Sequence, residues 1–416
     1  MLDVERIRKD FPILRTKMNG KPLIYLDSTA TSQKPRQVIN AISRFYRSYN
    51  ANIHRGIYQI AEKATDEYID SKTVLAKFIG AKGYREIVYV RNATEAINLA
   101  VLSWGDKNVV EGDRILISKM EHHSNIVPWQ MLAKKKNAVL DYIELRDGKT
   151  IDMGDYAKKL EGRPKIVAFT HASNVLGTIN DAQLMTKMAH EAGAMVLVDG
   201  AQSAPHMRVS MREIGCDFFA LSGHKMLAPT GIGALYAKEE LLEEMPPVYG
   251  GGDMIRSVGF QESTWNELPW KFESGTQNIE GGIGMKAAIR YLKKLGMDDI
   301  REHEKDLTGY ALKRLCELDY VKVYGPGIKD IDHRLGVIAF GIDGVHSHDA
   351  AAIFDSEGIA IRSGHHCAMP LVREIINEAA VSRMSFYIYN TKQEIDIAVE
   401  AIGKARKMFA RNASPV

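Results

Sequence analysis

The strongest constraint on the fold of this chain is an alternation of short apolar runs with amphipathic segments between about Ile87 and Leu235. The runs are rich in Val, Ile, Leu and Phe, as expected of strands buried on both faces of a parallel sheet. The segments between them, such as 182–192, have the apolar spacing of helices. This order is typical of doubly wound α/β sheets, in which ligands bind at the carboxyl ends of the strands.

Two polar residues follow neighbouring apolar runs inside this region. Asp199 ends the run Met195-Val196-Leu197-Val198, and Lys225 comes soon after Phe218-Phe219-Ala220-Leu221. Pyridoxal phosphate requires a lysine amine for its aldehyde and an acid beside its pyridine nitrogen. Partial burial near positive charge lowers the pKa of a lysine, which this reaction needs. Taken singly, Asp199 is more simply a helix cap and Lys225 a surface lysine, but the pair favours the cofactor.

A phosphate-binding turn and a pair of histidines lie upstream. The strand predicted at 86–90 leads through a short turn to a helix starting near Thr94. The amide N–H groups and the dipole of a helix start favour an anion, although a threonine there is often only a cap. His122 and His123 follow the next predicted strand. Adjacent side chains point to different faces, so one histidine stacking on a planar cofactor is favoured over a shared metal.

The composition describes an ordinary globular protein and argues against several classes. The chain has 416 residues, 45% of them hydrophobic, and a net charge of +3, so no attraction to nucleic acid is expected. Acidic residues near the start do not fit a secretion signal, and no apolar run is long enough to span a bilayer. Three cysteines form no disulfide framework and fit a reducing compartment. We therefore expect a cytoplasmic protein.

Cys367 differs from the other two cysteines in its surroundings. Cys216 and Cys316 sit among apolar residues and are predicted to be core. Cys367 follows a predicted strand, in a polar loop that contains glycine and ends in proline. The neighbouring histidines and an arginine favour the thiolate, which is the nucleophilic form. A zinc cluster of His365, His366 and Cys367 is disfavoured, because no further ligands stand at metal spacing.

Five motifs in or near these loops identify a family. They are Glu121-His122-His123, Ser173-Asn174-Val175-Leu176-Gly177-Thr178, Asp199-Gly200-Ala201-Gln202, Ser222-Gly223-His224-Lys225 and Arg362-Ser363-Gly364-His365-His366-Cys367-Ala368-Met369-Pro370. Taken jointly, they resemble class II cysteine desulfurases of the SufS type. Those proteins are fold-type I pyridoxal-phosphate enzymes of the aminotransferase class V superfamily. The resemblance runs from the first predicted helix to Tyr389-Asn390-Thr391.

The resemblance implies a role for each residue of the cofactor site. Lys225 would bind the aldehyde and move protons during the reaction. Asp199 would pair with the pyridine nitrogen, and Gln202 with the phenolic oxygen. His122 would stack on the ring and assist protonation. The phosphate would be held by Thr94, Ser222, His224 and, from the partner subunit, Thr276.

The resemblance also implies a substrate site. Arg383 would grip the substrate carboxylate through a two-pronged ion pair, a task suited to a planar guanidinium. Asn174 and His54 would line the pocket, with Arg362 near the mobile loop. Cys367 would attack the sulfur of L-cysteine, releasing L-alanine and leaving a persulfide on itself.

The resemblance further implies an α/β fold of two domains. Residues 19–283 would form a large domain with a mainly parallel seven-stranded sheet. Residues 1–18 and 284–416 would form a smaller α+β domain that carries the cysteine loop. A hairpin after the glycine run at 250–252 would reach the second copy of a homodimer with shared active sites. From the residues alone, Thr391 and Glu394 have capping-box spacing before a final helix predicted at 392–411.

The implied activity is sulfur supply for iron–sulfur cluster assembly. The acceptor would be a protein of the SufE or SufU kind or the SufBCD scaffold, and His346 and His348 are either part of its docking surface or solvated turn residues. A selenocysteine lyase or cysteine sulfinate desulfinase would use nearly the same site. A plain aminotransferase has no use for Cys367, and an inactive sulfur-handling protein would lack Lys225, Asp199 or Arg383.

Overall fold

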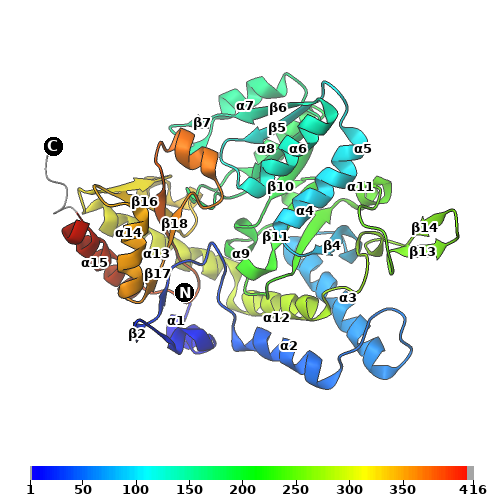
Figure 1. Cartoon of the computed structure of the whole chain (residues 1–416), viewed down its shortest axis with the longest axis horizontal. Coiled ribbons are helices and arrows are strands. Elements are labelled where there is room, and N and C mark those ends of the chain that lie inside the picture. Colours follow the sequence, from blue (N-terminus) through cyan, green and yellow to red (C-terminus); the bar gives the residue numbers. More distant parts are fainter. Residues whose placement is uncertain (1, 410–416) are drawn as a thin grey trace.

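Seven strands form the large sheet of the structure, a computed structural model that describes residues 2–409 (Figure 1). The strand order is β4-β12-β11-β10-β9-β5-β6. Strand β12 is antiparallel to both neighbours, and the other neighbouring pairs are parallel. The predicted mainly parallel seven-stranded sheet is therefore confirmed. Its strands are β4 (Ile87–Val90), β5 (Arg114–Ser118), β6 (Val139–Ile143), β9 (Ile166–Thr170), β10 (Met195–Asp199), β11 (Phe218–Ser222) and β12 (Gly233–Ala237).

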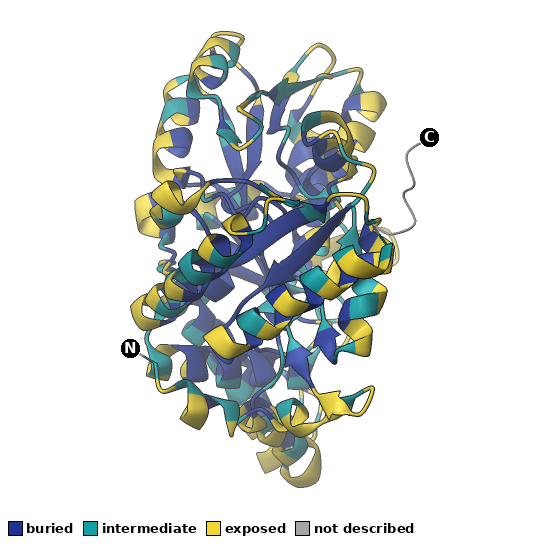
Figure 2. Cartoon of the chain, turned by 90° about the vertical axis from the view of Figure 1, so that its left-hand side faces the viewer, coloured by how far each residue is buried: buried dark blue, intermediate teal, exposed yellow. Residues whose placement is uncertain are grey.

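Both faces of this sheet are buried, because successive strand residues point to opposite sides. Val196 and Val198 of β10 belong to one apolar core, and Leu197 belongs to a second core on the other face. Figure 2 shows the strands almost wholly buried and the helices exposed on their outer sides. The first face is covered by α3 (Gln59–Ile79), α7 (Met153–Leu160), α8 (Ala182–Glu191), α10 (Met211–Ile214) and α12 (Ile279–Leu295), and the second by α4 (Ala93–Ala100), α6 (Val127–Lys136) and α11 (Glu239–Glu244).

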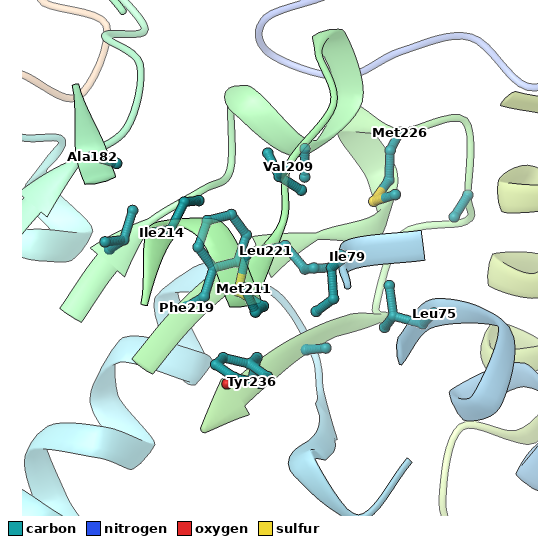
Figure 3. Close-up of a cluster of buried hydrophobic side chains, with 14 of the residues drawn as sticks. Leu75, Ile79, Ala182, Val209, Met211, Ile214, Phe219, Leu221, Met226 and Tyr236 are labelled. Atoms are coloured by element: carbon teal, nitrogen blue, oxygen red, sulfur yellow. The ribbon is translucent and has the colours of Figure 1, made fainter. Parts of the chain in front are cut away.

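Figure 3 shows part of the first core, which includes Phe219 of β11. Leu75 of α3 and Leu221 of β11 lie in the same cluster as Phe219. A side chain at Gly200 would begin 1.9 Å from the Phe219 ring, so the turn directly after Asp199 requires glycine. Core packing thereby fixes the backbone that presents the Asp199 carboxylate.

A second, four-stranded antiparallel sheet has the order β15-β16-β19-β18. It is built entirely from residues after 320, and it lies to the left of the large sheet in Figure 1. The sequence therefore places the cysteine loop directly after one of its strands. The strands are β15 (Val321–Tyr324), β16 (Val337–Ile342), β18 (Arg362–Gly364) and β19 (Val381–Ser385), packed against α13 (Met297–Cys316), α14 (Ser347–Ser356) and α15 (Lys392–Phe409).

The start of α15 has the predicted capping box. Thr391 Oγ1 accepts from the Glu394 amide at 3.3 Å, and a Glu394 carboxylate oxygen accepts from the Thr391 amide at 3.2 Å. Residues 410–411 of the predicted helix lie outside the described residues.

The beginning of the chain pairs with a segment from near its other end in a separate two-stranded sheet. Strand β3 (Ile24–Tyr25) pairs in parallel with β17 (Ile359–Ala360), and α1 (Val4–Arg8) is linked to α15 by an Arg8–Glu394 ion pair of 2.7 Å. The domain limits at 18/19 and 283/284 stay predictions. Other helices and strands are α2 (Arg36–Ser48), α5 (Asp106–Asn108), α9 (Ser203–His206), β1 (Lys17–Met18), β2 (Lys21–Pro22), β7 (Leu145–Arg146) and β8 (Thr150–Ile151).

A hairpin of β13 (Ile255–Val258) and β14 (Ser263–Trp265) projects beyond the large sheet at the right of Figure 1. Val258 and Phe260 are exposed on it. The hairpin stands where the resemblance places one; its contact with a second copy stays a prediction.

Candidate active site

A cavity of about 200 Å³ opens at the carboxyl ends of β9, β10 and β11. It draws residues from both sheets and from the loops between them. The structure brings eleven of the predicted site residues to its wall: Thr94, His122, Asn174, Asp199, Gln202, Ser222, His224, Lys225, Arg362, Cys367 and Arg383.

Asp199 and Lys225 come to this cavity from adjacent parallel strands. Asp199 is the last residue of β10, and Lys225 ends a 3-10 turn that follows β11. Burial lowers the pKa of Lys225 to about 8, with Asp199 opposing the shift. Burial also raises the pKa of Asp199, against the Ala201 amide that donates to it at 2.9 Å and the charge of Lys225. About a tenth of Lys225 is therefore neutral at pH 7, far more than for a free lysine, and the neutral amine is the nucleophilic form.

The predicted anion turn lies on the wall between β4 and α4. The Asn92 side chain accepts from the Glu95 amide at 3.0 Å, and Ser222 Oγ accepts from the Ala93 amide at 2.9 Å. The Thr94 and Ser124 hydroxyls are 2.6 Å apart. Hydroxyls therefore cluster at a helix N-terminus, whose dipole favours an anion.

His122 has a defined orientation in the cavity. Its Nδ1 accepts a hydrogen bond from the Ser124 amide at 3.0 Å, which places the proton of the neutral ring on Nε2. Burial, helped by the charge of Lys225, lowers the pKa of His122 to about 3. The ring is therefore a neutral N–H donor at physiological pH.

Glu121 lies behind His122 and accepts three hydrogen bonds. The Ser118 hydroxyl and the Thr170 amide donate to Oε1, the latter at 2.9 Å, and the Asn125 side chain donates to Oε2 at 2.7 Å. Trp129 fixes that amide in turn, because its Nε1 donates to Asn125 Oδ1 at 2.9 Å. Burial raises the pKa of Glu121 to about 8. This network joins the ends of β5 and β9 and holds the turn that carries His122.

Two arginines share one carboxylate on the opposite wall. Asp27 accepts from Arg383 Nη2 at 3.0 Å, and its other oxygen lies 3.3 Å from Arg362 Nε. Arg383 also donates to the carbonyl of Asn174 at 3.0 Å. Arg383 is buried, whereas the side chain of Arg362 is 49% exposed. Asp27 is not among the site residues predicted from the sequence, although it ends an apolar run just as Asp199 does.

Cys367 lines the cavity and is also exposed to solvent. Asn174 Nδ2 donates to the carbonyl of His366 at 2.7 Å, and the ring of His366 is hydrogen-bonded to the Val381 carbonyl at 3.0 Å. The His365 ring accepts from Arg373 instead. The two loop histidines thus point away from a common ligand, and no metal-binding group of His, Cys, Asp or Glu is found within residues 2–409.

Two predicted residues are not in this cavity. His54 packs its ring against Trp270, with centroids 4.4 Å apart, so the structure does not bring it to the pocket of its own chain. Thr276 is exposed and does not line the cavity either; its expected place is the partner's site.

The prediction that Cys316 is core is wrong: it ends α13 and is exposed, whereas Cys216 is buried. Apolar neighbours in sequence do not bury a residue at a helix end.

Comparison with known proteins decides the family. The aminotransferase class-V family model matches residues 24–397. The chain is 50% identical to a probable cysteine desulfurase of Halalkalibacterium halodurans over 98% of this chain and 99% of that protein. The chain belongs to the cysteine desulfurases of the aminotransferase class-V family.

Other members of this family extend the similarity. A probable cysteine desulfurase of Staphylococcus epidermidis is 48% identical over 98% of both chains. The apo structure of a cysteine desulfurase from Thermococcus onnurineus NA1 superposes with a TM-score of 0.92 at 38% identity, covering 99% of each chain. The cysteine desulfurase CsdA from Escherichia coli gives 0.90 at 33% identity, covering 98% of this chain and all of that one. Within residues 2–409, no helix has the length and apolar character needed to cross a membrane.

Proposed function

We propose that this chain is a cytoplasmic, pyridoxal-phosphate-dependent cysteine desulfurase of the SufS type. It converts L-cysteine to L-alanine and carries the sulfur as a persulfide on Cys367. The observation that carries this proposal is the presence of Cys367 in one cavity with Lys225 and Arg383. A nucleophilic thiol, an amine for an aldehyde and a guanidinium for a carboxylate are the three groups that this reaction needs.

The cavity fits pyridoxal phosphate. Asp199 and Lys225 stand at neighbouring strand ends and would hold the pyridine nitrogen and the aldehyde, and the hydroxyls of Thr94 and Ser222 would hold the phosphate at the start of α4. Among the described residues, the buried Gln202 Oε1 has no hydrogen-bond partner. An unmet buried acceptor is costly, and a ring hydroxyl would satisfy it. When bound, this cofactor supplies an electron sink for the α-carbon of an amino acid.

The residues of the chain divide the remaining work. Arg383 has a buried Nε without a partner among the described residues, and this N–H is free for a substrate carboxylate. The Cys367 thiolate forms a bond to the substrate sulfur while the bond from that sulfur to Cβ breaks. The electron pair of the broken bond stays with the carbon skeleton and is protonated to give alanine. Lys225 moves the protons, and the neutral Nε2–H of His122 assists.

The complete site is a property of a homodimer. The exposed hairpin 255–265 and the exposed Thr276 are available to a second copy, which would receive Thr276 beside its phosphate. The sulfur then passes to an acceptor of the SufE or SufU kind, or to the SufBCD scaffold, for iron–sulfur cluster assembly. His348 belongs to the acceptor surface in this proposal, because its Nδ1 lies 3.1 Å from the Ser363 hydroxyl in the strand that leads to Cys367.

The test compares purified wild type, Cys367→Ala and Lys225→Ala with L-cysteine, selenocysteine and cysteine sulfinate. We expect persulfide and alanine from L-cysteine in the wild type alone, and no yellow colour in Lys225→Ala. Selenium and sulfinate leave more readily than sulfur, so Cys367→Ala retains those two reactions. A Cys367→Ala protein that desulfurates L-cysteine at the wild-type rate would refute the role of Cys367. A wild type active only on the other two substrates would make the chain a selenocysteine lyase or sulfinate desulfinase.

A further inference from the structure

The backbone of the cysteine loop has an unusual conformation. His366 and Cys367 have φ angles of 52° and 56°, in the left-handed region that side chains other than glycine rarely adopt. Two such residues in a row persist only where surrounding contacts hold them. Because Cys367 and Met369 are both exposed, those contacts must come from the inner side of the loop.

His123 supplies two of these contacts. Its backbone N–H donates to the carbonyl of Cys367 at 2.6 Å, and its ring Nε2 accepts from the amide of Met369 at 2.9 Å. Both contacts of this one residue lie on the C-terminal side of the Cys367 side chain, at the Cys367 carbonyl and at the amide two residues further on. Asn174 adds the hydrogen bond to the His366 carbonyl on the preceding residue.

The ring of His123 is not placed for acid–base work on the substrate. It does not line the cavity, whereas the adjacent His122 does. Its Nε2 is occupied by the Met369 amide, so the neutral ring carries its proton on Nδ1. The two adjacent histidines thus serve different partners, one the cavity and the other the cysteine loop.

We propose that His123 is a positioning residue that holds the Cys367 thiol over the substrate sulfur by fixing the loop backbone directly after it. This inference rests on the proposed function for the identity of the reaction, but the contact itself does not. Loss of the ring acceptor removes one of the contacts that hold His366 and Cys367 in the left-handed region, and the thiol then leaves its reactive position. Persulfide formation slows, whereas substrate binding, which uses Arg383 and Lys225, is unaffected.

The test uses the holoenzyme and three variants. His123→Leu removes the acceptor. His123→Gln restores one, because its side-chain amide oxygen has about the reach of the imidazole Nε2. His365→Leu is the matched control, since this histidine lies in the same loop but its ring bonds Arg373. Three quantities are measured: hydrogen exchange of the Met369 amide, the spectral change on mixing with L-cysteine, and the single-turnover rate of persulfide formation on Cys367.

Loss of one hydrogen bond corresponds to roughly a tenfold change at most. We expect His123→Leu to speed Met369 exchange about tenfold and to slow persulfide formation about fivefold, with cysteine affinity unchanged. His123→Gln should stay within about twofold of wild type in both. Selenocysteine turnover, which depends less on the thiol, should change little in any variant.

Three results overturn the proposal. One is a wild-type rate of persulfide formation in His123→Leu, and another is an equal loss in His123→Gln. The third is an equal loss in His365→Leu, which would assign the effect to general disturbance of the loop. A wild-type enzyme that forms no persulfide would instead refute the proposed function, and Met369 exchange would still decide whether the His123 contact exists.

Discussion

The carboxylate of Asp27 lies 3.0 Å from Nη2 of Arg383, although 356 positions separate the two residues in sequence. The same carboxylate reaches Arg362 at 3.3 Å. Asp27 therefore neutralises a buried guanidinium before any substrate arrives, and it sets the angle at which Arg383 faces the cavity. In the proposed function, the carboxylate of an incoming amino acid would join an existing ion pair.

Asp27→Asn should destabilise the protein. The change leaves Arg383 buried without a neutralising charge, and breaking such a pair costs about 3 kcal/mol in the free energy of unfolding. The KM for L-cysteine should rise about tenfold, because a misplaced guanidinium loses about 1.4 kcal/mol of binding. Urea denaturation and steady-state kinetics measure the two effects.

Arg362→Gln provides the comparison for Asp27→Asn. This variant removes the half-exposed partner of the same carboxylate, and it should lower the free energy of unfolding by less than about 1 kcal/mol. Equal losses of stability in the two variants would show that Asp27 does not support Arg383.

Glu121→Gln should lower the stability of the protein by about 2 kcal/mol. The new amide N–H₂ would face the Asn125 amide N–H₂, and Asn125 cannot turn without losing its bond to Trp129. Adding Asn125→Asp should restore most of the loss, because an aspartate accepts from both the introduced glutamine amide and Trp129. Denaturation of the single and double variants measures the loss of stability and its recovery. A double variant no more stable than Glu121→Gln would contradict the predicted recovery.

Lys225→Met should stabilise the cofactor-free protein in a pH-dependent way. The pKa of Lys225 falls from 10.5 to about 8 on burial, so below pH 8 the folded protein bears the full cost of a buried cation. Between pH 8 and 10.5 only the unfolded chain keeps this proton, and wild-type stability therefore rises with pH. The variant should be more stable by up to about 3 kcal/mol below pH 8, and this advantage should vanish by pH 10.5. If the free energies of unfolding of the two proteins changed with pH in parallel, Lys225 would not be a buried cation below pH 8.

Phe260→Ser should weaken the homodimer. Phe260 is fully exposed at the hairpin and has no apolar cover in the single chain. An aromatic anchor of this kind contributes about 2 kcal/mol to association, so the dimer dissociation constant should rise about thirtyfold. Sedimentation measures it, with Met408→Ser, an exposed apolar residue on α15, as the control. An unchanged constant for Phe260→Ser would remove the hairpin from the interface.

Much of this site is predictable from the sequence because strand ends meet at one edge of a parallel sheet. Asp199 and Lys225 can be paired from the sequence alone, since each follows an apolar run. Asp27 follows such a run too, but its strand belongs to no large sheet, and its partners Arg362 and Arg383 come from the other end of the chain. No local pattern contains that pairing.

Other features depend on packing between distant segments. The family resemblance places His54 in the pocket, but its ring rests on Trp270, a contact that spacing does not encode. The different contacts of His122 and His123 depend on which ring nitrogen accepts from which backbone amide, and the sequence does not show this. The predicted role of Thr276 requires a second copy of the chain, which a single chain does not contain.

The parallel pairing of Ile24 with Ile359 has a consequence for biosynthesis. A ribosome releases Asp27 long before it makes strand β17 or the cysteine loop. The two arginines that contact the Asp27 carboxylate, Arg362 and Arg383, are also made late. Strand β3 therefore leaves the exit tunnel without a neighbour and waits through most of translation. The nascent chain can assemble the sheet that bears Asp199 and Lys225 during this interval, but its pocket stays open on one side. The pocket can therefore become complete only after nearly the whole polypeptide has been made.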